Sequence, residues 1–130
     1  MPVTTDSLGM QVRQTIADLA AAGEAYRAAS DALARAVATE TTRRNVFDYA
    51  ETALRAKLHR QGVEGRNEAE RKAYLDNALD DDEDLDELRT LLDQAVEERQ
   101  RAEGAFRAAD QAQKSLRAIL AALTALCGRE

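Results

Sequence analysis

Apolar residues recur every seven positions along most of the chain, with a second apolar position between them. In the first part the repeat runs through Val12, Leu19, Tyr26, Leu33, Phe47 and Leu54. The companion position holds Ile16, Gly23, Ser30, Val37 and Leu58, with Arg44 and Glu51 as interruptions. Steps that alternate between four and three residues are typical of a coiled-coil seam. We therefore expect one long helix over about residues 7–60.

The last part of the chain repeats this pattern more strictly and predicts a second long helix over about residues 82–127. One column holds Leu85, Leu92, Arg99, Phe106, Gln113, Leu120 and Cys127. The other column holds Leu88, Ala95, Ala102, Ala109, Leu116 and Leu123. The apolar stripe is widened by Leu91, Val96, Ala105, Ile119 and Leu126. Because a stripe this wide usually faces more than one helix, it indicates a further helical partner.

The segment between the long helices predicts a turn followed by a short helix, over about residues 61–80. Gly62 and Gly65 end the first helix, since glycine tolerates the left-handed backbone of a C-terminal cap. Asn67 followed by Glu70 has the spacing of a capping box, so the short helix begins near residue 68. The aspartates of residues 80–82 then cap the final helix.

Together these elements predict an all-α fold: a long antiparallel coiled-coil helical hairpin with a short connecting helix, forming one domain over residues 1–130. Folding back places Leu54 near Leu88, Phe47 near Ala95, Leu33 near Ala109 and Leu19 near Leu123. Large residues then meet small ones at several levels, as interdigitated packing requires. The polar interruptions Glu40, Arg44 and Arg99 fall at one level.

A lone hairpin buries only one thin seam, which is too little to offset the conformational entropy lost on folding. We therefore expect a homo-oligomer, a dimer or higher, most simply a four-helix bundle formed by two hairpins. The residues expected to be buried in the seams are Leu19, Tyr26, Leu33, Phe47, Leu54, Leu88, Leu92, Phe106, Leu116 and Leu123.

The composition supports helices and gives few candidates for catalysis. Pro2 is the only proline, and aromatic residues make up 4%, which argues against an all-β domain. The single cysteine, Cys127, cannot form an intrachain disulfide, and it is expected to pack in the seam. The single histidine, His59, is expected in the last turn of a helix.

No phosphate-binding loop or nucleophile elbow occurs, so we expect no enzyme activity, no cofactor and no metal site. Without a signal peptide or a membrane-spanning run, we expect a cytoplasmic protein with no membrane partner.

The acidic excess of the chain lies in its middle, around the turn region. Residues 61–90 carry four basic and eleven acidic side chains, whereas the flanking segments are close to neutral. The densest part is the acidic run, which comprises Asp80, Asp81, Asp82, Glu83, Asp84, Asp86 and Glu87. We interpret the acidic run as a docking site for a basic protein surface, with a solvated helix start as the simpler alternative.

Two other functions are open from the sequence. The basic residues near the turn could contact single-stranded DNA, and they include Arg43, Arg44, Arg55, Lys57, Arg60, Arg66, Arg71 and Lys72. Asp80, Glu83, Asp84 and Glu87 have helical spacing and could hold magnesium, as in all-α nucleotide hydrolases. The first helix, however, offers no matching pair of glutamates.

The segment from Gly65 to Leu75 resembles a stretch of small helical-hairpin proteins of bacteriophages and prophages, in which a Gly-x-Asn-x-x-x-Arg turn joins two long helices. Here Gly65, Asn67 and Arg71 occupy the motif. The resemblance implies a phage origin and an accessory role in DNA recombination or replication. It carries over no catalytic residue.

Overall fold

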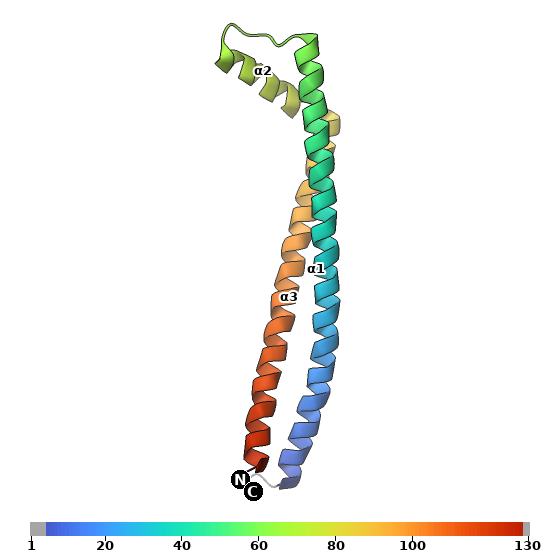
Figure 1. Ribbon diagram of the computed structural model, residues 1–130, viewed down its shortest axis with the longest axis vertical. Helices are drawn as coiled ribbons and strands as arrows, with labels where there is room; N and C mark the ends of the chain where they lie inside the picture. Colours follow the sequence, from blue (N-terminus) through green and yellow to red (C-terminus); the bar gives the residue numbers. More distant parts are fainter. Residues whose placement is uncertain (1–4, 129–130) are drawn as a thin grey trace. The chain divides into compact units, whose positions relative to one another are not determined.

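The chain folds into three α-helices in the computed structural model, which describes residues 5–128. Helix α1 spans Thr5–Gln61, α2 spans Glu68–Asp80 and α3 spans Glu83–Gly128 (Figure 1). The described residues contain no β-strand, so the predicted all-α fold is confirmed. Each helix begins and ends within a few residues of the range expected from the sequence.

The helices form two compact units, through both of which α1 and α3 run. Unit 1 consists of residues 1–34 and 101–130, and unit 2 consists of residues 35–100. In unit 1 the ring centroids of Tyr26 and Phe106 are 5.1 Å apart. In unit 2 Arg99 forms an ion pair with Glu40, and the Arg89 guanidinium lies 5.6 Å from the centroid of Phe47. Since the residue numbers rise on α1 as they fall on α3, the helices pack antiparallel, and the predicted helical hairpin is confirmed.

The register of the hairpin differs in part from the expected pairing in both units. In unit 2 Leu54 and Leu88 line one hollow, as expected, but the Phe47 ring, expected beside Ala95, lies 5.6 Å from the Arg89 guanidinium. Pairing Leu33 with Ala109 would place Tyr26 opposite Leu116, one heptad further along each helix. The ring that Tyr26 contacts is instead that of Phe106. The expected register of unit 1 is therefore wrong, because a seven-residue repeat fits almost equally well after α3 slides along α1.

The inner face of α1 also differs in part from the expected one. A second inward column holds Leu8, Thr15, Ala22, Ala29, Ala36 and Ala50, all buried or half-buried, and is interrupted by the exposed Arg43. Ile16 and Val37, which were expected in the seam, are 52% and 43% exposed. The expectation followed side-chain hydrophobicity, whereas this inward column of α1 consists mostly of alanines.

The best-formed core lies in unit 2. There the buried apolar residues are Leu75, Leu79, Leu85, Leu92 and Ala95, whereas unit 1 buries Leu8 and Thr15. Of the ten expected seam residues only Leu92 is buried, and the other nine are half-buried. Phe106, Leu116 and Leu123, which were expected to be buried, are half-buried in the single chain, since a pair of helices covers only one side of each.

Side-chain and backbone caps fix the ends of α2 and the start of α3. The Asn67 side chain accepts a 2.9 Å hydrogen bond from the Glu70 backbone, and the Glu70 carboxylate accepts one of 2.7 Å from the Arg66 backbone. The Asp82 carboxylate accepts a 2.8 Å bond from the backbone of Leu85 and caps α3. The connection between α2 and α3 is therefore only Asp81 and Asp82.

Candidate functional site

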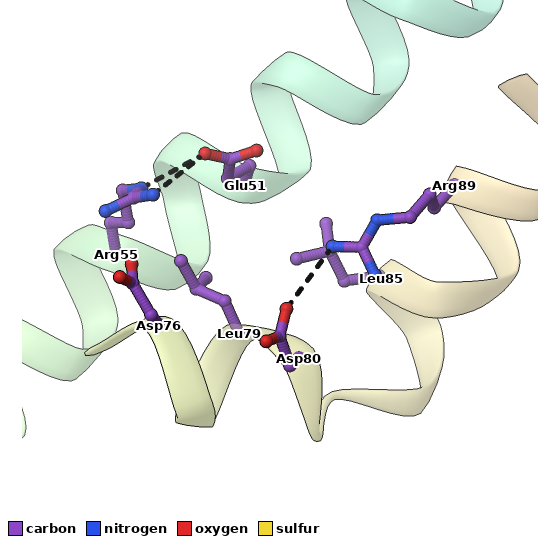
Figure 2. Close-up of a pocket in the computed structure, with 7 residues that line it drawn as sticks. All are labelled: Glu51, Arg55, Asp76, Leu79, Asp80, Leu85 and Arg89. Atoms are coloured by element: carbon purple, nitrogen blue, oxygen red, sulfur yellow. Dashed lines mark hydrogen bonds and ion pairs between the residues drawn. The ribbon is translucent and has the colours of Figure 1, made fainter. Parts of the chain in front are cut away.

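A hollow of about 260 Å³ opens where all three helices of unit 2 approach one another (Figure 2). We call it the three-helix hollow. Helix α1 contributes Glu51 and Arg55, α2 contributes Asp76, Leu79 and Asp80, and α3 contributes Leu85 and Arg89. Because α2 and α3 are joined by two residues, the end of one helix and the start of the next are held at the same site.

The three-helix hollow combines apolar and charged side chains. Leu79 and Leu85 are 5% and 2% exposed and form its apolar part. Arg55 donates to the Glu51 carboxylate from Nε at 3.2 Å and from a terminal nitrogen at 3.1 Å. Arg89 lies 4.0 Å from the carboxylate of Asp80. Three carboxylates and two guanidiniums therefore surround an apolar floor, which leaves one net negative charge at neutral pH.

The acidic run begins at this hollow and continues onto α3. Asp80 is the last residue of α2, Asp81 is the C-cap of α2, and Asp82 is the side-chain cap of α3 described above. Glu83, Asp84, Asp86 and Glu87 lie at the start of α3, where the helix dipole favours negative charge. All seven side chains are exposed except that of Asp82, which is half-buried. Arg89 also approaches Asp86, at 3.6 Å, so it serves as a counter-charge to two members of the run.

Two further hollows border the acidic run. One, of about 300 Å³, is lined by Asp82 and Asp84 of the run, by Lys57 of α1, and by apolar side chains that include Leu54 and Leu88. The expected neighbourhood of Leu54 and Leu88 is thereby confirmed. The other, of about 320 Å³, is lined by Asp86, Glu87, Thr90 and Leu91. The carboxylates of the acidic run therefore lie beside hollows that also have apolar lining residues.

The four carboxylates that were considered as magnesium ligands do not lie on one helix. Asp80 ends α2, whereas Glu83, Asp84 and Glu87 belong to α3, so the four do not share one helix as their spacing suggested. Among the described side chains no group of three or more histidine, cysteine, aspartate or glutamate residues is arranged to hold a metal ion. We assign no metal ligand.

The basic residues named for DNA contact are distributed over α1, the connection and α2. Arg43, Arg44, Lys57, Arg60, Arg66, Arg71 and Lys72 are exposed, and Arg55 is half-buried in the three-helix hollow. Arg44 pairs with Glu40 at 3.2 Å. Tyr74, the aromatic residue of α2, is half-buried rather than presented for base stacking.

Sequence reasoning missed Glu51, Asp76 and Arg89 as members of a site. Glu51 carried a signal, because it interrupts an apolar column of the first helix. Arg89 also carried one, since it is the first basic residue after the acidic run. What the sequence did not contain is the placement of α2, which brings Asp76 beside α1.

The single histidine and the single cysteine do not line the three-helix hollow. His59 is exposed in the last turn of α1, as expected. Cys127 was expected in the seam but is exposed, as are all of residues 124–128 at the end of α3. Elsewhere, the pKa of Lys114 is raised by its 2.8 Å contact with the Asp110 carboxylate.

Comparisons with protein-family models, with curated proteins and with solved structures found no match for this chain. Over the described residues, no helix has both the length and the apolar character needed to cross a membrane.

Proposed function

We propose that this protein is a non-enzymatic adaptor: a coiled-coil oligomer that presents the acidic run to a protein partner with a basic surface. The observation that carries the proposal is the exposure of six of the seven carboxylates of the run beside three hollows with apolar parts. In line with its resemblance to phage hairpin proteins, we place this adaptor among accessory proteins of phages.

The chemistry of the three-helix hollow suits a lysine or arginine side chain of the partner. Such side chains lay their aliphatic stems on apolar surface while the charged head remains among polar groups. Leu79 and Leu85 provide the apolar surface, and the carboxylates of Asp76 and Asp80 lie at its edge. A guanidinium of the partner would replace the long 4.0 Å contact that Arg89 makes with Asp80.

A defined probe tests this proposal. Binding of a fluorescent, arginine- and lysine-rich peptide of roughly 20 residues is followed by anisotropy. Wild type is compared with a triple variant in which Glu83→Gln, Asp84→Asn and Glu87→Gln remove charge without touching the caps. We expect the triple variant to bind about tenfold more weakly and with less dependence on salt, since exposed charge pairs contribute up to about 1 kcal/mol each.

The matched control removes three charges elsewhere in unit 2, through Glu64→Gln, Glu68→Gln and Asp93→Asn, all at exposed positions. It should bind the peptide within about twofold of wild type. Equal weakening by both triple variants would reduce the effect to net charge and reject a docking site. A single-stranded oligonucleotide is titrated in parallel. Tight DNA binding that is lost on Arg43→Ala and Arg44→Ala, without peptide binding, would favour the DNA-accessory function instead.

A further inference from the structure

The chain exposes more surface than a compact protein of its mass. Its solvent-accessible area is 9424 Å² for 14.2 kDa. Compact monomers of this mass expose about 6,800 Å², so the excess is about 2,600 Å² per chain. Two chains that covered this excess would bury about 5,000 Å² together, which is the range of obligate homodimers. This excess area leaves room on the chain for an interface with a second copy.

In unit 1, α3 has a broad apolar side that does not face α1. The column Ala105, Ala112, Ile119 and Leu126 is exposed throughout, with Ile119 49% and Leu126 48% exposed. The neighbouring column adds Ala108, Ser115 and Ala122, also exposed. Neither column contains a charged residue between residues 105 and 126.

Helix α1 extends this apolar side. On α1, Ala25 stands in the column that flanks the inward residues Ala22 and Ala29. Ala21 and Ala28 stand in the next column outward. Ala21, Ala25 and Ala28 are all exposed. In an antiparallel helix pair, the corresponding flanking columns of the two helices lie on the same side. Together the exposed columns of α1 and α3 form what we call the alanine face of unit 1.

The opposite side of unit 1 is charged. There Glu24 and Arg27 of α1 line a hollow with Gln113 and Arg117 of α3. The α3 part of the alanine face differs from the charged side, because its two exposed columns carry no charge between residues 105 and 126, whereas on α1 the column of Ala25 also holds the exposed Asp18.

The charge of the two units also selects unit 1 for self-association. Unit 1 contains seven basic and seven acidic residues, whereas unit 2 contains eleven basic and seventeen acidic ones. Two copies of unit 1 therefore meet without net repulsion, while two copies of unit 2 would each bring six net negative charges.

We propose that the alanine face of unit 1 binds the same face of a second copy, in a two-fold symmetric dimer whose contact is a four-helix layer. Small side chains allow helices to approach at the short end of the usual range, about 8 Å between axes. Ile119 supplies a large side chain within this face and Leu126 supplies one at its end, in the last turn of α3. This inference rests on the oligomer of the proposed function and assigns its surface.

Two isoleucines of unit 1 provide a matched test. Ile119 lies on the alanine face and Ile16 on the charged side, and they are 49% and 52% exposed. In sedimentation equilibrium at about 20 µM chain, wild type and Ile16→Glu should have twice the 14.2 kDa chain mass. Ile119→Glu should have the mass of one chain. A monomeric wild type, a mass other than two chains, or dissociation by Ile16→Glu alone would overturn the proposal.

A second measurement does not depend on how Ile119→Glu folds. In a Cys127→Ser background, Ala112→Cys places a thiol on the alanine face, and Ala20→Cys places one at the charged hollow. Maleimide modification of Ala112→Cys should slow at least tenfold between nanomolar and micromolar protein, and that of Ala20→Cys should not. Equal behaviour of the two thiols would overturn the interface. If wild type is monomeric but still binds the basic peptide, the dimer interface is rejected and docking of a basic partner is not. If wild type is dimeric but does not bind the peptide, the adaptor function is rejected and the interface is not.

Discussion

Arg99 of α3 forms an ion pair with Glu40 of α1 inside the helix interface of unit 2. Both residues occupy columns that are otherwise mainly apolar, and their side chains are only 24% and 13% exposed. Glu40 also accepts from Arg44 of its own helix at 3.2 Å. The expectation that Glu40, Arg44 and Arg99 share one level is confirmed. A polar layer of this kind costs stability and fixes which registers the helices can adopt.

Removing one charged member of this layer should lower the free energy of unfolding more than removing both. Glu40→Leu takes the carboxylate from a partly buried guanidinium and should lower the free energy of unfolding by about 1–2 kcal/mol. The double variant Glu40→Leu with Arg99→Leu should be at least as stable as wild type, because two leucines complete the apolar columns. Urea denaturation measures both, with the more exposed Arg44→Leu as the control. Additive losses in the double variant would contradict a coupled layer.

Leucine truncations should separate the core of unit 2 from its surface. Leu85 is 2% exposed and Leu91 is 36% exposed on the same helix. Leu85→Ala should cost about 2–5 kcal/mol, as truncations that leave a cavity do, and Leu91→Ala less than about 1 kcal/mol. Thermal unfolding followed by circular dichroism gives the comparison. Similar costs at the two positions would mean that the interior of unit 2 is not where we place it.

Two glycines should respond oppositely to alanine. Gly65 has φ of +148°, and an added Cβ would lie 2.7 Å from the backbone nitrogen of Arg71. Gly65→Ala should therefore destabilise the start of α2 by more than about 1 kcal/mol. Gly104 is a helical residue with open space around it, so Gly104→Ala should stabilise α3 by about 0.5–1 kcal/mol. Equilibrium unfolding of the two single variants checks the opposite signs.

The pair of Lys114 and Asp110 should show its effect only at high pH. The hydrogen bond and the charge of Asp110 raise the pKa of Lys114 above its ordinary value of 10.5. A raised lysine pKa contributes stability that is fully present at neutral pH and is lost as the pH rises through the folded-state pKa. Asp110→Asn should return the pKa of Lys114 towards 10.5, which NMR titration of the lysine side chain measures. An unchanged titration would mean that the contact does not persist in solution.

The sequence predicted the helices well because their signals are local. The heptad columns of α3, the asparagine at the start of α2 and the glycines after α1 each act within a few residues. Accordingly, Asp82 caps α3 within the range of residues expected to do so.

The contacts between helices were harder to predict. They depend on which heptad of α1 lies beside which heptad of α3, and the repeats allow several choices. Ile16 looked like a seam residue by hydrophobicity, yet Thr15 is the buried neighbour, with its hydroxyl donating 2.8 Å to the Gln11 carbonyl. That local bond satisfies the polar group and lets a threonine occupy an inner position. The three-helix hollow was unpredictable for a related reason, since Asp76 enters it only through the way α2 is placed.

The connection between α1 and α2 has a consequence for the covalent chain. Residues 62–67 are non-helical and, apart from Val63, exposed, and Arg66 lies among them. A single cut by trypsin after Arg66 would leave every helix whole and divide the chain into one fragment with α1 and another with α2 and α3. Those fragments would be joined by side chains alone. We therefore expect two separately made pieces to reassemble into the hairpin, at a rate that reports how quickly the two long helices find one another.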